Sequence, residues 1–401
     1  MKKPTKLLSL LLSALLLLSV CSVAGFAVQD TATQETSAPQ LKFGKDGTFT
    51  ILHLTDTQDD QYPAHELKPF LTKAIEQAQP DLIVFTGDLV EDFRLADFKD
   101  NFGVVEGVFA FGLKGKDKEK THSNAILAAQ YVLSIFEESG VPFAMVQGNN
   151  DYKVNVSNED WKALYATYSH NLTNDMSDMS AGIDYRLPIY GADGKEVKLN
   201  VYCLDSGEHE IDPASIEWYV SDSSAQKAQD GTATPAFAFQ HIPVDEVGNL
   251  FEECKWNDAG ASPYGFKSYK LVDGAHGYFT KVYQSEGASD EFTAWKQQGD
   301  IIAAFFGHMH TEGYTGTYDG IELNLTYGCE FAKSGPYGMR VITLSEDDVT
   351  NYQNQSFSYE DGIFTPDPFN ASEKTLLQKI KLFFSSLLNI AKLLIRKVLP
   401  V

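Results

Sequence analysis

Two histidines stand together at the end of an apolar run in the last third of the chain. The run from Ile301 to Phe306 is followed directly by Gly307, His308, Met309 and His310. Imidazole nitrogens are common metal ligands, so a buried strand that ends in such a pair predicts a metal site at the strand's end. An ordinary surface turn would carry the same two residues. The interpretation therefore depends on whether partners occur elsewhere in the sequence.

Four other polar residues follow predicted strands in the same way. They are Asp56, Asp88, Asn149 and His241. Gathering such groups at one buried sheet edge costs much free energy unless they are paired or bound to metal. Carboxylate and amide oxygens mixed with imidazole suit Mn, Fe, Zn or Mg, and two such ions that share a carboxylate can clamp a phosphate. The six residues together predict a centre for divalent ions that could bind a phosphate group.

Strands and helices alternate in the order needed to position these residues. The expected strands are 48–54, 81–85, 142–146, 197–204, 236–240, 301–306, 320–327 and 338–344. Helices are expected at about 64–79 and 123–138, with Ser123 as the amino-terminal cap of the second. Successive strand and helix units predict an α/β fold whose functional residues lie on loops at the carboxyl ends of strands. Segment 91–120 is expected to be a loop or insertion, and 251–292 an irregular rim of a substrate cleft.

The motifs resemble those of the calcineurin-like metallophosphoesterase family, over roughly residues 47–346. In the family's order, the chain carries Asp56-Thr57-Gln58, Gly87-Asp88, Gly148-Asn149-Asn150-Asp151, His241 and Gly307-His308-Met309-His310. Two further segments are similar to its secreted, purple-acid-phosphatase-29-like branch, namely Phe239-Gln240-His241-Ile242-Pro243 and Tyr327-Gly328 leading to Tyr337-Gly338. The resemblance implies a four-layer α/β/β/α sandwich with a two-metal site at the strand ends.

The resemblance also implies a role for each position. The first ion would be held by Asp56, Gln58, Asp88 and His310. The second ion would share Asp88 and add Asn149, His241 and His308. A hydroxide between the ions would attack, in line, the phosphorus of a phosphoester small molecule, which is the substrate that the resemblance implies. Asn150 and Asp151 take the catalytic positions.

Two positions depart from the family's pattern. The family normally has histidine where this chain has Gln58, and a neutral amide oxygen predicts a looser first site that prefers Mn, Mg or Ca over Zn. The family also commonly has histidine at position 150. Asn150 cannot transfer a proton, so leaving groups that need protonation should react slowly. His122 or His209 are candidates for the missing acid, whereas His53, inside the first strand, is expected to be structural.

The composition of the chain limits the classes of protein to which it can belong. A chain of 401 residues that is 43% hydrophobic and 12% aromatic can bury a large core. Its formal net charge of −23 predicts an acidic surface that repels polyanions, so no nucleic-acid partner is expected. The three cysteines beyond the amino-terminal segment are Cys203, Cys254 and Cys329, and their odd number and spacing predict no disulfide framework.

The amino terminus has the pattern of a secretory signal. Lys2 and Lys3 precede an apolar run over 7–20, and Gly25 and Ala27 are small at the two positions that matter for cleavage. We expect a signal peptide at 1–27, a flexible polar leader at 28–40, and a protein that is secreted or held in the cell envelope. The alternative is a lipoprotein cysteine at Cys21, which the bulk of Val20 disfavours.

The carboxyl terminus differs in kind from the rest. We expect the metallophosphoesterase domain to occupy 41–348, a linker 349–370, and a basic amphipathic helix 371–401. That last segment has six Lys or Arg residues and one acid, a formal charge of +5, with apolar residues at steps of three and four. It would either lie on an anionic membrane surface as a peripheral contact or pack on the acidic domain.

Two functions remain open on the sequence alone. The first is an exported, divalent-metal-dependent phosphoesterase that hydrolyses phosphodiester or phosphomonoester bonds. The second is a non-catalytic protein of the same fold that binds a phosphorylated ligand at the cell envelope. Gln58 and Asn150 motivate the second, and metal stoichiometry separates the two.

Overall fold

The computed structural model describes residues 40–91, 118–175, 182–264, 267–283, 289–332 and 335–367. The predicted signal peptide and the basic segment 371–401 lie outside the described residues, as does nearly all of the predicted leader and most of the predicted insertion at 91–120. In the described part of the chain, no helix is long and apolar enough to cross a membrane.

A six-stranded sheet carries the first half of the predicted site. Its strand order is β16-β15-β14-β1-β2-β3. The strands are β1 (Thr48–Leu54), β2 (Leu82–Thr86), β3 (Phe143–Val146), β14 (Tyr337–Ser345), β15 (Gln353–Glu360) and β16 (Ile363–Pro366). β1, β2 and β3 are parallel, so their carboxyl ends lie at one edge of the sheet.

The expected linker at 349–370 is wrong, because β15 and β16 lie within it and extend the same sheet. β15 begins Gln353-Asn354-Gln355-Ser356, a run of residues with weak strand preference. Its backbone pairs with β14 from Thr343 to Tyr337, and this pairing decides its structure.

A seven-stranded sheet carries the second half of the site. Its strand order is β10-β12-β13-β11-β6-β5-β4. The strands are β4 (Tyr185–Tyr190), β5 (Val197–Cys203), β6 (Ala236–Gln240), β10 (His276–Tyr278), β11 (Ile301–Phe306), β12 (Gly313–Tyr318) and β13 (Ile321–Leu325). The central strands β5, β6, β11 and β13 are parallel. β6 is buried at every residue, as expected for a parallel strand covered on both faces.

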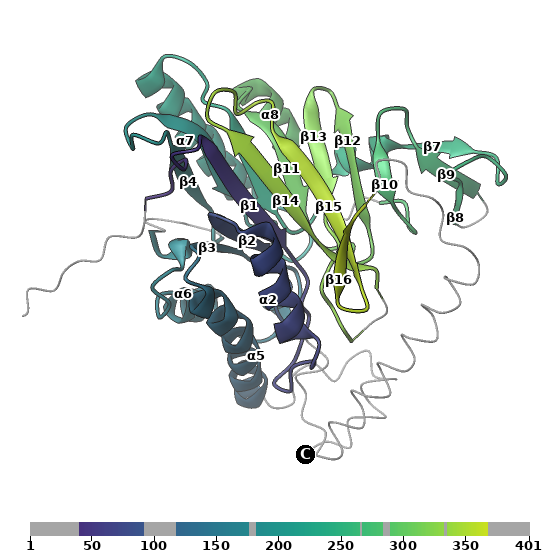
Figure 1. Cartoon of the computed structure of the whole chain (residues 1–401), viewed down its shortest axis with the longest axis horizontal. Coiled ribbons are helices and arrows are strands. Elements are labelled where there is room, and N and C mark those ends of the chain that lie inside the picture. The colour runs from purple at the N-terminus through teal and green to yellow at the C-terminus, as the bar shows by residue number, and fades with distance from the viewer. Residues whose placement is uncertain are drawn as a thin grey trace, which may run out of the picture. The chain divides into compact units, whose positions relative to one another are not determined.

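Helices cover the outer face of each sheet (Figure 1). α2 (Leu67–Ala78) and α5 (Lys118–Ser139) pack beside the six-stranded sheet, and α7 (Pro213–Asp230) and α8 (Glu291–Gln298) beside the seven-stranded one. One apolar core joins α2 and α5 to both sheets, and a second fills the space between the seven-stranded sheet and α7 and α8. The predicted four-layer α/β/β/α sandwich is therefore confirmed.

Two local expectations need correction. α5 begins at Lys118, so Ser123 lies inside the helix and is not its cap; its hydroxyl donates to the Glu119 carbonyl at 2.9 Å. The region expected to be irregular contains a three-stranded sheet of order β7-β9-β8, in addition to β10. These strands are β7 (Phe251–Cys254), β8 (Ser262–Tyr264) and β9 (Lys267–Leu271).

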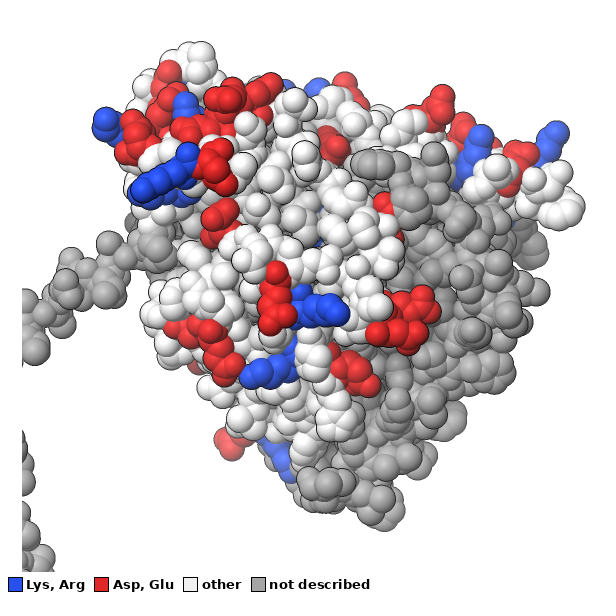
Figure 2. All heavy atoms as spheres, in the orientation of Figure 1, with Lys and Arg blue, Asp and Glu red and all other residues white. Residues whose placement is uncertain are grey.

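Shorter helices complete the connections. They are α6 (Asn158–Tyr165) and the 3₁₀ helices η1 (Asp151–Lys153), η2 (Leu172–Asp175) and η3 (Asp245–Leu250). On the face shown in Figure 2, several cationic side chains lie next to acidic ones. Lys68 and Glu138 form one exposed ion pair of the described residues, at 2.9 Å. Exposed pairs of this kind contribute little to stability.

Candidate metal centre

The loops that follow five parallel strands converge on one site. Asp56 follows β1, Asp88 follows β2 and Asn149 follows β3, all in the six-stranded sheet. His241 follows β6, and His308 and His310 follow β11, in the facing sheet. The carboxyl ends of the parallel strands of both sheets thus supply all six residues predicted from the sequence.

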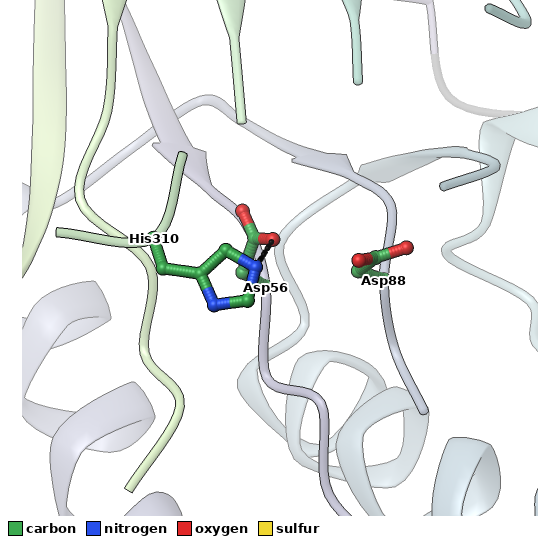
Figure 3. Close-up of side chains that lie close together, drawn as sticks. All are labelled: Asp56, Asp88 and His310. Carbon is green, nitrogen blue, oxygen red and sulfur yellow. Dashed lines mark ion pairs between the residues drawn. The ribbon is translucent and has the colours of Figure 1, made fainter. Parts of the chain in front are cut away.

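Asp56, Asp88 and His310 form the first group of donors. One ligand atom from each lies within 4.8 Å of the other two, and Figure 3 shows the three side chains extending from separate loops. One carboxylate oxygen of Asp56, Oδ2, accepts hydrogen bonds from the Thr55 hydroxyl at 2.7 Å and the His308 amide at 3.0 Å. The other oxygen, Oδ1, is buried, accepts no hydrogen bond, and lies 3.6 Å from His310 Nε2. A cation in this group would satisfy that oxygen.

Asn149, His241 and His308 form the second group. The Asn149 side-chain oxygen lies 3.0 Å from His241 Nε2 and 2.9 Å from His308 Nδ1, and these two nitrogens are 3.3 Å apart. His241 Nδ1 lies 2.7 Å from the carbonyl of Thr86, an acceptor, so Nδ1 carries a proton. In the neutral ring, Nε2 then presents a lone pair to the same point as the amide oxygen. This donor set also fits a divalent ion.

Asp88 lies between the two groups. Its Oδ2 is 3.4 Å from His241 Nε2, and Oδ2 also accepts a hydrogen bond from the Gln58 amide at 2.5 Å. Burial alone would raise the pKa of Asp88, but the charge and hydrogen bond of His241, the Asn150 amide and the charge of His310 together outweigh burial and hold that pKa well below its usual range. Burial alone would lower the pKa of His241, and Asp88 instead raises it to about 9. Metal binding at this pair would therefore release a proton.

The backbone at the site is strained. The residues Asp56, Gln58, Asp88, His308 and His310 all have positive φ, between 37° and 70°. Such values are uncommon for residues with a side chain, and they persist only where the surrounding structure imposes them. The clustering of five of them around one point marks the site independently of side-chain chemistry.

Glycine is required where these loops approach one another. A Cβ added to Gly148 would lie 2.1 Å from the Asp88 backbone nitrogen, and one added to Gly307 would lie 2.0 Å from the Thr55 hydroxyl oxygen. Both distances are far below van der Waals contact. The glycine that precedes Asn149 and the glycine that precedes His308 therefore allow the ligand-bearing loops to pack together.

Comparison with known proteins decides the family. The family model for calcineurin-like phosphoesterases matches residues 49–312. The chain belongs to the calcineurin-like phosphoesterase family. That assignment confirms the resemblance seen in the sequence motifs.

Individual relatives of this family are distant in sequence. The chain is 25% identical over 339 residues to probable inactive purple acid phosphatase 29 of Arabidopsis thaliana, covering 73% of this chain and 74% of the relative. It is 24% identical over 315 residues to phosphatase DCR2 of Saccharomyces cerevisiae, covering 71% and 48% of the two chains. A solved dimetal phosphatase from Danio rerio aligns with a TM-score of 0.44 at 12% identity, covering 78% of this chain and 99% of that one.

Gln58 occupies the position where the family pattern has histidine. Its amide nitrogen donates to Asp88 and lies 3.2 Å from His310 Nε2, so the side chain reaches the first group. As oriented, the amide presents its nitrogen, and a 180° rotation of the amide would present the oxygen at the same point. The role of Gln58 as a metal ligand thus stays a prediction. Its side chain lies beside Asp88 and His310, where such a ligand would have to be.

Replacing Gln58 by histidine is expected to tighten the first metal site. Imidazole is a stronger ligand than a neutral amide oxygen and suits zinc better, so Zn²⁺ affinity should rise by about 10-fold or more while Mg²⁺ affinity falls. Competition with a zinc-sensitive chelator measures the first effect. A Gln58→Asn variant, which keeps the amide, serves as control, and equal Zn²⁺ affinity of the two variants would contradict the assignment.

Asn150 and Asp151 differ in what they contact. The Asn150 side chain donates to Asp88 Oδ2 at 2.7 Å, at the edge of the centre. Asp151 is fully buried and accepts the backbone amides of Asp88 and Gly148, both at 2.9 Å. Burial and the nearby charge of Asp88 raise the pKa of Asp151 to about 8. These contacts are those of a positioning residue that ties two ligand loops together, which differs from the catalytic role expected for Asp151.

Glu330, in the segment after β13, is a site residue that the sequence analysis missed. Its Oε2 lies 2.8 Å from His310 Nδ1, and it is 3% exposed. A carboxylate on one ring nitrogen fixes the tautomer of a metal-binding histidine and directs the other nitrogen to the ion. No motif in the sequence links position 330 to position 310. The only signal for Glu330 in the sequence is its position just after the predicted strand 320–327 and close to Tyr327-Gly328.

Replacing Glu330 by glutamine is expected to weaken metal binding at His310. Loss of a carboxylate partner of this kind typically costs 10-fold to 100-fold in metal affinity, and we expect a loss of about that size here. Equilibrium dialysis against buffered Mn²⁺ provides the measurement. Glu322→Gln is the control, because Glu322 lies on β13, the strand that precedes Glu330, and contacts Asn354 and Tyr352. The orienting role fails if both variants bind Mn²⁺ as the parent does.

Two further histidines, His53 and His122, and the cysteines have ordinary structural contacts. His53 is fully buried, with ring nitrogens 2.8 Å from the Thr86 hydroxyl and 2.9 Å from the Thr326 hydroxyl, which confirms its structural assignment. His122 pairs with Asp160 at 3.5 Å. Cys203, Cys254 and Cys329 are free, so the described residues contain no disulfide among them.

Proposed function

We propose that this chain is a divalent-metal-dependent phosphoesterase that hydrolyses phosphodiester or phosphomonoester bonds. The observation that carries the proposal is the buried Asp56 Oδ1, which lacks a hydrogen bond and faces His310 within a group that also contains Asp88. A second donor group of Asn149, His241 and His308 lies beside it. Two adjacent oxygen and nitrogen donor groups that share a carboxylate are the arrangement that phosphoester hydrolysis uses.

The ions would be Mn, Fe, Zn or Mg. Bound there, they would supply Lewis-acid stabilisation of the phosphoryl oxygens and lower the pKa of water. The chain's own residues would do the rest. Asn150 presents an amide at the edge of the centre, where it can donate to a phosphoryl oxygen but cannot protonate a leaving group. Lys153 Nζ donates to the Asn150 side-chain oxygen at 3.3 Å and adds positive charge beside Asn150.

Metal-dependent hydrolysis tests the proposal directly. The full chain would be stripped with chelator, reloaded with each candidate ion, and assayed on p-nitrophenyl phosphate and bis(p-nitrophenyl) phosphate. We expect hydrolysis only after reloading, with the diester or other activated substrates favoured over simple alkyl monoesters because position 150 lacks a proton donor. Rates after reloading that equal those of the stripped chain, for every ion and both substrates, would contradict the proposal.

A second function has specific support. The Arabidopsis relative is described as probably inactive, and this chain has Gln58 and Asn150 at two family histidine positions. A non-catalytic protein that binds a phosphorylated ligand at the cell envelope would keep the fold and need one ion or none. Metal analysis of the purified chain separates the two, because two ions per chain favour the enzyme.

Export and membrane contact are further parts of the proposal. The charged and apolar pattern of residues 1–27 supports export, and the basic stripe at 371–401 supports a peripheral contact with an anionic membrane. Flotation with anionic liposomes, with and without residues 371–401, tests the contact. Identical flotation of both forms would remove it.

A further inference from the structure

A cavity separate from the metal centre lies beside the segment that carries His241. It measures about 270 Å³, counting space that opens to solvent. Gln240 and Ile242, the two neighbours of His241, both line it, whereas none of the seven predicted metal ligands does. The segment at the end of β6 therefore contributes His241 to the metal centre and its two neighbours to a different space.

Two buried side chains in this cavity each have an oxygen without a partner. Gln240 and Glu291 are each 2% exposed, and the Oε1 atom of each accepts no hydrogen bond. Unpaired buried oxygens are rare in folded proteins, because the loss of water is not compensated. Two of them lining one cavity indicate that something outside the chain completes their coordination.

The orientation of the Gln240 amide is determined by its neighbours. Its nitrogen donates to the Ile242 carbonyl at 2.8 Å and to Glu291 Oε2 at 3.2 Å. Turning the amide over would place its oxygen against both of these acceptors. The free atom is consequently the amide oxygen, and it lies on the side chain that contacts Glu291.

The lining of the cavity is acidic and rich in oxygen. Ser206, Glu210 and Asp245 line it together with Gln240 and Glu291, and none of the described lining residues is Lys or Arg. His209, the histidine among these described lining residues, has a side chain that is 71% exposed. Burial also raises the pKa of Glu291 to about 8, as expected for a carboxylate that lacks a positive partner. A cation in the cavity would supply that positive partner, and oxygen donors select a hard one.

We propose that this cavity binds a hard divalent cation of the Ca²⁺ class, with Gln240 Oε1 and the Glu291 carboxylate among its ligands. All of these donors are oxygens, unlike the mixed oxygen and imidazole donors of the metal centre, so the two sites should differ in metal preference. An ion held by Gln240 would also brace the backbone on either side of His241. The inference does not depend on phosphoester hydrolysis.

Terbium luminescence tests the site directly, because Tb³⁺ replaces Ca²⁺ and is excited by a nearby tyrosine ring. Tyr283 lines the cavity and can provide that excitation. The full chain would first be saturated with Mn²⁺ at the metal centre and then titrated with Tb³⁺, followed by displacement with Ca²⁺. We expect a tyrosine-sensitised signal that Ca²⁺ removes and that falls at least several-fold in a Tyr283→Phe variant.

Substitution of the ligands provides the decisive comparison. Glu291→Gln keeps the size of the side chain and removes its charge, so Ca²⁺ affinity should fall about 10-fold or more. Gln240→Met, which removes the free oxygen, should lower it in the same direction. Asp300→Asn is the matched control, because Asp300 is another buried carboxylate but its oxygens are hydrogen-bonded to Tyr219 at 2.5 Å and Ser223 at 2.6 Å.

The Ca²⁺ affinities of these variants distinguish a cation site from a cavity that holds only water. Weaker Ca²⁺ binding in Glu291→Gln, with parental binding in Asp300→Asn, supports the site even if no phosphoester is hydrolysed. Equal Ca²⁺ affinity in the parent and in both ligand variants, each folded by circular dichroism, overturns it and assigns the free oxygens to water. Should Glu291→Gln fail to fold, Gln240→Met gives the same comparison.

Discussion

Replacing Asp88 by asparagine is expected to reduce hydrolysis by on the order of 10³-fold or more and to lower the metal content from two ions to one or none. Asp88 lies within the first donor group and 3.4 Å from His241 of the second. Its charge is the one that both ions would share, and asparagine keeps the shape while removing the charge. Steady-state kinetics on an aryl phosphodiester, together with metal analysis of the same sample, provide the measurement.

The control for this variant is Asp46→Asn. Asp46 precedes β1 at the end opposite Asp56 and accepts a hydrogen bond from the Thr48 amide, so it is an acid of the same strand unit far from the loops of the site. An Asp88→Asn chain that retained two ions and full activity would rule out the shared-carboxylate arrangement.

Replacing Asn150 by histidine is expected to accelerate the hydrolysis of alkyl phosphomonoesters by about 10²-fold, because general acid assistance is typically worth 10² to 10⁴. The Asn150 side chain already contacts Asp88 at 2.7 Å, so a ring at this position would lie at the edge of the centre. Aryl esters, whose leaving groups need no proton, should change much less. The measurement is the ratio of kcat/KM for an alkyl and an aryl phosphate in each variant.

Asn150→Gln is the control for this gain. It retains an amide and lengthens the side chain, so the alkyl-to-aryl ratio should remain near that of the parent. If the histidine and glutamine variants show the same ratio, position 150 does not limit protonation of the leaving group, and the low reactivity of alkyl esters needs another explanation.

The sequence was sufficient for the parts of the fold that local pattern determines. β1 and β6 were predicted at their observed bounds, because each is a short run rich in apolar residues between polar segments. The same pattern placed Asp56, Asp88 and His241 at the ends of strands. This placement predicted that the three residues meet, since the carboxyl ends of parallel strands lie at one edge of a sheet.

The local sequence pattern did not predict those strands whose structure depends on pairing with a neighbouring strand. β15 lacks strand-forming residues at its start, and β7 carries Glu252 and Glu253, which have weak strand preference. In the fold, Glu252 lies opposite Lys270 of β9 and forms an ion pair with it at 3.0 Å. The partner strand, rather than the segment's own composition, makes each of these a strand.

The sequence by itself determined the α/β class and the six residues that meet at the strand ends, because both follow from the alternation of strands and helices and from the residue types that end each strand. The sandwich architecture came from the resemblance to the family. Only the tertiary structure revealed Glu330 behind His310, the positioning role of Asp151, and the paired free oxygens of Gln240 and Glu291. These depend on contacts between residues with no regular spacing along the chain. Packing brings such side chains together in the fold, and no periodic pattern records that contact.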